Sequence, residues 1–138
     1  MEQKSAWERE QQLGLATIDS EHQLQERLVA VLRDAVASGR DQSVVSEILR
    51  RVEDTSNVHF MSEELLMRLE AFEDYGQHVE EHRTLLAQLA ELRERFEADP
   101  GIDLGPSIGW IEGWLSSHVR QMDRCFTESV LKQKSGVT

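Results

Sequence analysis

The chain has 138 residues, of which 39% are hydrophobic, and it carries a formal net charge of -11. This length fits one domain, and the negative charge argues against binding to nucleic acid or to an anionic membrane surface, because their phosphates repel it. There is neither a run of apolar residues long enough to span a membrane nor an apolar leader, and the single cysteine, Cys125, fits a reducing compartment, so we expect one cytoplasmic domain over residues 1–138.

The first half of the chain predicts an arm and two helices. Residues 1–18 are mostly polar and Gly14 is a helix breaker, so we expect an extended N-terminal arm there. Apolar residues then recur at helical spacing over residues 19–38, and Gly39 suits the left-handed conformation that ends many helices. A second helix is expected over residues 41–70.

The second half predicts two further helices, over residues 76–97 and 106–132. The loop between them contains Asp99-Pro100-Gly101, which is typical of a turn, and Pro106 fits the first turn of the last helix. Four helices joined by short connections predict an all-α fold, an up-down-up-down four-helix bundle.

Every histidine falls on the apolar face of its predicted helix, and each helix carries at least one of them: His22, His59, His78, His82 and His118. Two carboxylates share these faces, Glu63 and Asp123. So many polar groups facing one core would cost much free energy unless something paired them. The pattern therefore predicts a metal site inside the bundle.

The spacing of these residues supports one shared site. His59 and Glu63 lie four residues apart, as do His78 and His82, so each pair projects from one face of a helix. His118 and Asp123 are five residues apart, which separates them by about 140° on a regular helix. Either Asp123 reaches around the helix or a π-bulge realigns the two residues.

Counting ligands indicates two metal ions with one vacancy. Five imidazoles, two bridging carboxylates and one bridging oxide or hydroxide fill all but one of the coordination positions of two octahedral ions. Imidazole and carboxylate suit iron, zinc, copper or nickel, so the donors alone leave the metal open. A vacancy of this kind binds one small ligand.

The same residues carry a resemblance to a known family. The pattern His22, His59-Phe60-x-x-Glu63-Glu64, His78-x-x-x-His82 and Trp114-Leu115-x-x-His118-x-x-x-x-Asp123 resembles that of the hemerythrins, most closely the bacterial single-domain form. The resemblance covers nearly the whole chain. It implies a non-haem centre of two Fe ions, bridged by oxo or hydroxo, that binds O2 reversibly.

The resemblance also implies roles for individual residues. One iron would be held by His78, His82 and His118. The other, five-coordinate iron, where O2 binds, would be held by His22 and His59. Glu63 and Asp123 would bridge the two irons.

The expected ligand pocket departs from the family at one position. Phe60, Trp114 and Leu115 would supply an apolar lining, but Gln25 stands where family members usually carry an aliphatic residue. Its side chain either turns toward the helix flank or lies near the bound ligand. In the second case its amide would bond the ligand directly or hold a water, and we favour the water.

The resemblance implies an O2-binding protein for storage, delivery or scavenging, and not an enzyme. One alternative is an O2 or redox sensor that acts through a separate partner. Another is a di-iron oxidase or iron-handling protein, but such sites are rich in Glu-x-x-His pairs, which this chain lacks. The expected partner is O2, and an enzyme that consumes the O2 would be a further, unidentified one.

Overall fold

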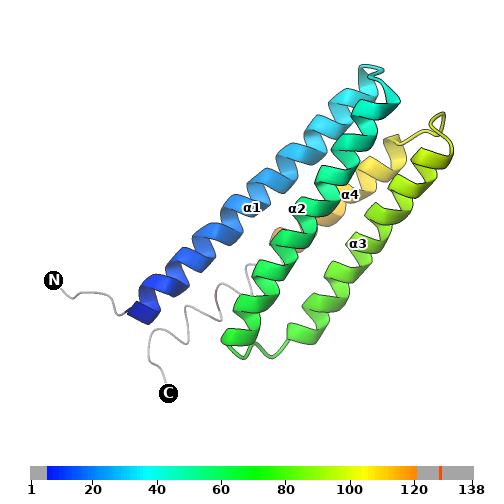
Figure 1. Ribbon diagram of the computed structural model, residues 1–138. Helices are drawn as coiled ribbons and strands as arrows, with labels where there is room; N and C mark the ends of the chain where they lie inside the picture. Colours follow the sequence, from blue (N-terminus) through cyan, green and yellow to red (C-terminus); the bar gives the residue numbers. More distant parts are fainter. Residues whose placement is uncertain (1–5, 121–127, 129–138) are drawn as a thin grey trace.

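The computed structural model describes residues 6–120 and residue 128, with side chains from residue 16 onward. Four helices run up and down through these residues: α1 (Ala6–Ala37), α2 (Gln42–Leu69), α3 (Tyr75–Ala98) and α4 (Gly105–His118). They form an antiparallel bundle in which α2 packs between α1 and α3 (Figure 1). Helix α4 completes the bundle, chiefly by packing against α1 and only sparsely against α3. The all-α four-helix prediction is confirmed.

The N-terminal segment differs from the prediction. Helix α1 begins at Ala6, so residues 6–18, expected as part of an extended arm, are helical. Residues 6–13 are mostly Glu, Gln, Arg, Ala and Leu, which are strong helix formers, and one glycine inside a helix costs only about 1 kcal/mol. Further along, Ile18 is buried against Met67 of α2, which holds this part of α1 on the bundle.

The turns follow the sequence signals closely. Gly39 adopts a positive φ of 66° after α1, and the amide of Arg40 donates to the carbonyl of Ala35 over 3.0 Å, which closes the helix end. Between α2 and α3, Ala71 takes the same left-handed conformation with a φ of 52°. Pro106 lies in the first turn of α4, as predicted.

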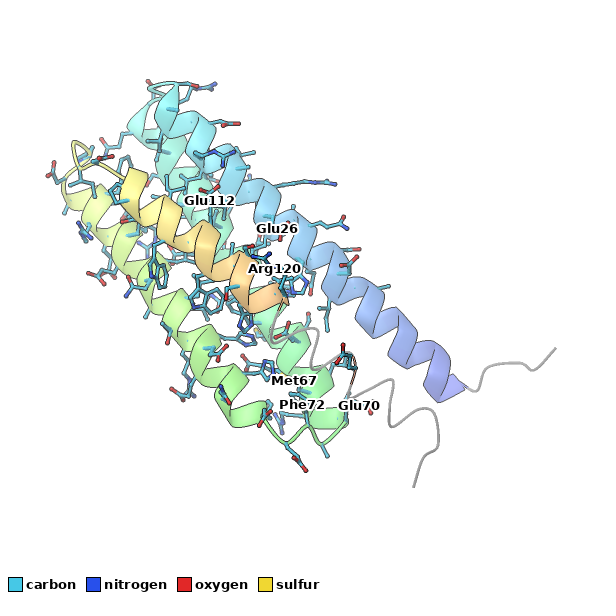
Figure 2. All side chains as sticks on the ribbon, turned by 180° about the vertical axis from the view of Figure 1, so that it is seen from behind. Glu26, Met67, Glu70, Phe72, Glu112 and Arg120 are labelled. Carbon is cyan, nitrogen blue, oxygen red and sulfur yellow. The ribbon has the colours of Figure 1, made fainter. Side chains whose placement is uncertain are left out.

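The buried side chains form a main apolar core and, next to it along the helices, a layer of polar side chains. Leu32, Leu49, Leu89 and Ile111, one from each helix, belong to the main core, and each is at most 2% exposed. A small apolar cluster around Met67 closes the other end, where Figure 2 labels Met67 and Phe72. The buried histidines lie along the helices between these two apolar regions.

No helix within residues 6–120 combines the length and the apolar character that crossing a membrane would require. On the outside, the Nη1 of Arg33 donates to Glu112 over 2.6 Å, which joins α1 to α4; Figure 2 labels Glu112 on that face. Such an exposed ion pair contributes little to stability.

Candidate metal centre

All five histidines and Glu63 are buried, at 6% exposure or less. Their helices bring them together from every side of the bundle: His22 from α1, His59 and Glu63 from α2, His78 and His82 from α3, and His118 from α4. The helical spacing explains each pair, because residues four apart share one helix face. Six of the seven predicted ligands therefore meet in one place.

These six residues form two overlapping groups. One group contains Glu63 with His78, His82 and His118, and the other contains Glu63 with His22 and His59. Within each group the potential ligand atoms all lie within 4.8 Å of one another. Glu63 is the residue that the two groups share.

The two oxygens of Glu63 face the two groups separately. Oε1 lies 2.9 Å from Nε2 of His82 and 3.8 Å from Nε2 of His118. Oε2 lies 3.7 Å from Nε2 of His22 and 3.5 Å from Nε2 of His59. A carboxylate oriented in this way can bind one metal ion with each oxygen.

Hydrogen bonding and burial show that a cation fits the centre. Among residues 16–120, Nε2 of His59 and both ring nitrogens of His78 have no hydrogen-bond partner, although they are buried. Burial lowers the pKa of His59 to about 3 and also lowers the pKa of His78. Both imidazoles are therefore neutral near pH 7, with lone pairs that a metal ion can accept.

His82 lies in a different electrostatic environment. Burial disfavours its charged form, but the hydrogen bonds and negative charges of Glu63 and Glu64 outweigh burial and raise its pKa. An environment that attracts a proton to a buried imidazole also attracts a metal cation. Imidazole and carboxylate donors suit iron, zinc, copper or nickel.

A second set of carboxylates supports three of the histidines from behind. Nδ1 of His59 lies 3.4 Å from Glu21, Nδ1 of His82 lies 2.7 Å from Glu64, and Nδ1 of His118 lies 2.9 Å from Glu81. Each of these contacts joins a glutamate on one helix to a histidine on the next helix in the chain. When Nδ1–H donates to the carboxylate, the lone pair of Nε2 points to the interior.

The sequence reasoning missed this supporting role. Glu21 and Glu81 were assigned no function, and Glu64 was part of the motif without a role. The signal was present, since each of them is the neighbour in sequence of a predicted ligand. Their histidine partners lie on other helices, so only the packed bundle identifies the contacts.

We expect Glu64→Ala to weaken metal binding about 10- to 100-fold, because His82 would lose the group that orients it and increases its basicity. The affinity is measured by titrating apo-protein with ferrous iron in competition with a chelator, without air. Glu47→Ala, at an exposed position of the same helix, is the matched control. Equal affinities for Glu64→Ala and Glu47→Ala would contradict this role.

Aromatic rings flank the histidines on the apolar side. Phe60 stacks on His82 with ring centroids 4.0 Å apart and its ring centroid lies 5.5 Å from that of His59. Trp114 stacks on His118 at 4.5 Å, and Leu115 is buried in the main core. Phe60 and Trp114 thus lie at the centre, in contact mainly with the three-histidine group, whereas a position of Leu115 beside the ligand stays a prediction.

Gln25 points into the bundle and not toward the helix flank. It is 1% exposed, and its amide Nε2 donates to Oγ of Ser56 on α2 over 2.7 Å. Ser56 is itself fully buried. The sequence reasoning did not single out Ser56.

Asp123, the seventh predicted ligand, lies outside the described residues, as does Cys125. Next to this part of the chain, however, Val119 and Arg120 follow α4 in a π-helical turn. A π-helical turn brings residues five apart into line, which is one of the two arrangements expected for His118 and Asp123. The coordination of Asp123 stays a prediction.

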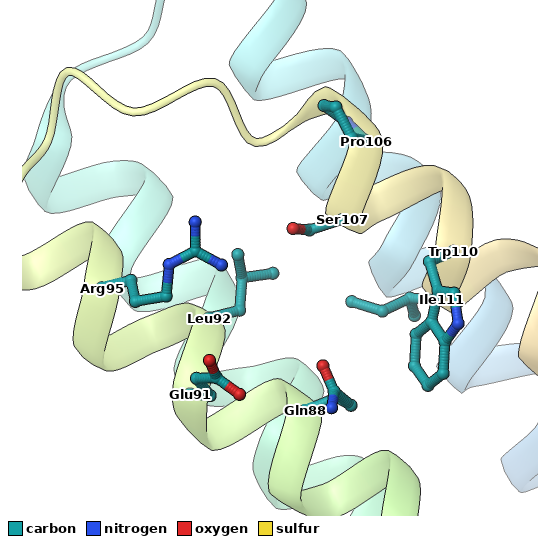
Figure 3. Close-up of a pocket in the computed structure, with 8 residues that line it drawn as sticks. All are labelled: Gln88, Glu91, Leu92, Arg95, Pro106, Ser107, Trp110 and Ile111. Carbon is teal, nitrogen blue, oxygen red and sulfur yellow. The ribbon is translucent and has the colours of Figure 1, made fainter.

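A pocket of about 290 Å³ between α3 and α4 is separate from the histidines (Figure 3). The lining includes the apolar Leu92 and Ile111, the charged Arg95 and the exposed Trp110. It contains none of the predicted ligands. The pocket is therefore a surface feature apart from the buried cluster.

Comparisons with known proteins match the chain to one family. The family model "Hemerythrin HHE cation binding domain" matches residues 13–127. A bacteriohemerythrin of Stenotrophomonas maltophilia (strain R551-3) is 26% identical over 127 residues, which cover 90% of this chain and 80% of the relative. A bacteriohemerythrin of Methylococcus capsulatus (strain ATCC 33009 / NCIMB 11132 / Bath) is 27% identical, over 78% of this chain and 82% of the relative.

A third relative, a bacteriohemerythrin of Ralstonia nicotianae (strain ATCC BAA-1114 / GMI1000), is 31% identical over 88% of this chain and 85% of its own length. No solved structure matches the chain. The matched region contains every predicted ligand, from His22 to Asp123.

Proposed function

The chain belongs to the hemerythrin family, and from this premise we propose that it binds O2 reversibly at a centre of two iron ions. The observation that carries the proposal is the orientation of Glu63, whose two oxygens face three histidines on one side and two on the other. This division supports two adjacent ions that share one carboxylate. It also supports a different number of protein ligands for the two ions, because the ion with two histidines would have a vacant position.

The proposed ligand roles follow the family motif. His78, His82 and His118 would hold one iron, His22 and His59 would hold the other, and both irons would share Glu63 and Asp123. When bound, the two irons supply the redox chemistry and the open position that reversible O2 binding needs.

The protein around the centre controls access and orientation. Phe60, which is 2% exposed and stacked on His82, keeps bulk water away from that imidazole. Glu21, Glu64 and Glu81 hold the rings of the three supported histidines in place. A rigid site shielded from bulk water favours release of the ligand unchanged over a side reaction with water.

An oxidase is less compatible with the donor set. The described part of the cluster contains five histidines and one carboxylate, whereas di-iron carboxylate proteins surround the metals with glutamates. We therefore assign binding, and not catalysis, to this centre.

Reversibility is the decisive test. Protein loaded with ferrous iron under argon should gain a visible absorption band when O2 is added, and the band should disappear when argon is restored. Repeated cycles should return the same amplitude. A band that forms only once, or colour that persists under argon, would contradict reversible binding and favour an oxidase.

A further inference from the structure

Gln25 and Ser56 form a buried polar pair between α1 and α2. Both are buried, at 1% and 0% exposure, and one amide N–H of Gln25 donates to the hydroxyl of Ser56 over 2.7 Å. Burying two polar side chains costs free energy that one neutral hydrogen bond only partly offsets. An aliphatic pair would pack the same space without that cost.

The pair lies next to one half of the metal centre. Gln25 follows His22 by three residues on α1, and Ser56 precedes His59 by three residues on α2. Residues three apart on a helix are neighbours, with Cβ atoms about 5–6 Å apart. The rings of His22 and His59 are themselves 4.2 Å apart, so the polar pair adjoins the two-histidine side.

The pair retains unused donors. An amide group has two N–H donors and a hydroxyl has one, but the Gln25–Ser56 bond uses only one of the three. Other serines of the bundle donate to a carbonyl one turn back, as Ser38 does to Asp34 and Ser62 to Val58. Within residues 16–120, Ser56 has no such carbonyl partner. Two buried donors thus remain beside the two-histidine side.

We propose that Gln25 and Ser56 form a hydrogen-bonding subsite for a small anion or a water molecule held on the His22–His59 side of the centre. The inference rests on the proposed function, since the ligand is retained there by the metal. The subsite favours ligands that accept hydrogen bonds over ligands that do not. The long side chain of Gln25 extends toward the ligand, and the hydrogen bond to Ser56 fixes the orientation of the Gln25 amide.

Azide binding to the di-ferric protein tests the subsite, because azide is a small anion that accepts hydrogen bonds. The affinity is measured by optical titration for the wild type, Gln25→Leu, Ser56→Ala and the double variant. We expect each single variant to bind azide roughly tenfold to a hundredfold more weakly. The double variant should be about as weak as Gln25→Leu, because residues in contact act as a unit.

Ser46→Ala is the matched control. Ser46 lies on the same helix and donates to Glu97 over 3.1 Å, away from the histidines, so this variant should bind azide as the wild type does. The melting temperatures of the wild type, Gln25→Leu, Ser56→Ala and the double variant, all measured without metal, give a second readout. The fall in melting temperature of the double variant should be smaller than the sum of the two single changes.

The outcomes separate this inference from the proposed function. Unchanged or tighter azide binding in Ser56→Ala and Gln25→Leu would overturn the subsite and leave O2 binding untouched, even if the melting temperatures showed coupling. If Gln25→Leu does not fold, Ser56→Ala decides alone, because it removes a single oxygen atom. A wild-type protein that takes up no iron would instead overturn the proposed function.

Discussion

His78→Ala is expected to lower the iron content from about two ions per chain to one or fewer. His78 is fully buried, and its ring nitrogens have no hydrogen-bond partner among residues 16–120. Its removal leaves the three-histidine group with two imidazoles, Glu63 and an empty volume. Metal analysis of protein produced with ample iron gives the number of ions directly.

Arg83→Ala is the control for this experiment. Arg83 is next to His82 in sequence but exposed, where it pairs with Glu80, so the variant should retain the full iron content. An iron content of two in His78→Ala would show that His78 is not a ligand. One zinc and no iron in the wild type would contradict the two-iron centre itself.

Anaerobic addition of ferrous iron at a hundredfold excess over the dissociation constant is expected to raise the melting temperature of the apo-protein by roughly 15–20 °C. Metal bound only to the folded state stabilises it by mass action, by about 2.7 kcal/mol for each site at a hundredfold excess over the dissociation constant. For a chain of this size, 1 kcal/mol shifts the melting temperature by roughly 3–4 °C. The buried Glu63, whose charge the metal would neutralise, strengthens the effect.

The melting curves are recorded by circular dichroism with and without iron. His78→Ala should show a smaller rise than the wild type, since it retains fewer ligands. Superimposable curves for apo and iron-treated wild type would count against a metal site in the core.

Much of the fold was predictable because the apolar residues repeat at helical spacing. The buried positions of α2, for example, include Val45, Leu49 and Val52, each one turn after the last. The start of α1 was not predictable in the same way. Gly14 suggested a break, but the flanking helix formers and the contact between Ile18 and Met67 outweigh one glycine.

The metal cluster was predictable for a different reason. Polar residues seldom recur on the apolar face of a helix, so His59 and Glu63 were conspicuous in the sequence. The partners behind the histidines were not, because Glu21 and Glu81 resemble ordinary surface residues and act on a neighbouring helix. Ser56 was equally inconspicuous, since a serine occurs readily on any helix face.

The sparse packing of α4 against α3 has a consequence for the order in which the protein is assembled. Helix α2 packs extensively on both α1 and α3, whereas the described part of α4 depends on α1 and on the position of His118 among the other histidines. Metal binding by His118 would therefore stabilise the packing of α4 on the other three helices. In chains without bound iron, α4 should therefore be the first helix to unfold locally, and proteases should cut the chain there. The supply of iron would then determine the lifetime of the protein in the cell.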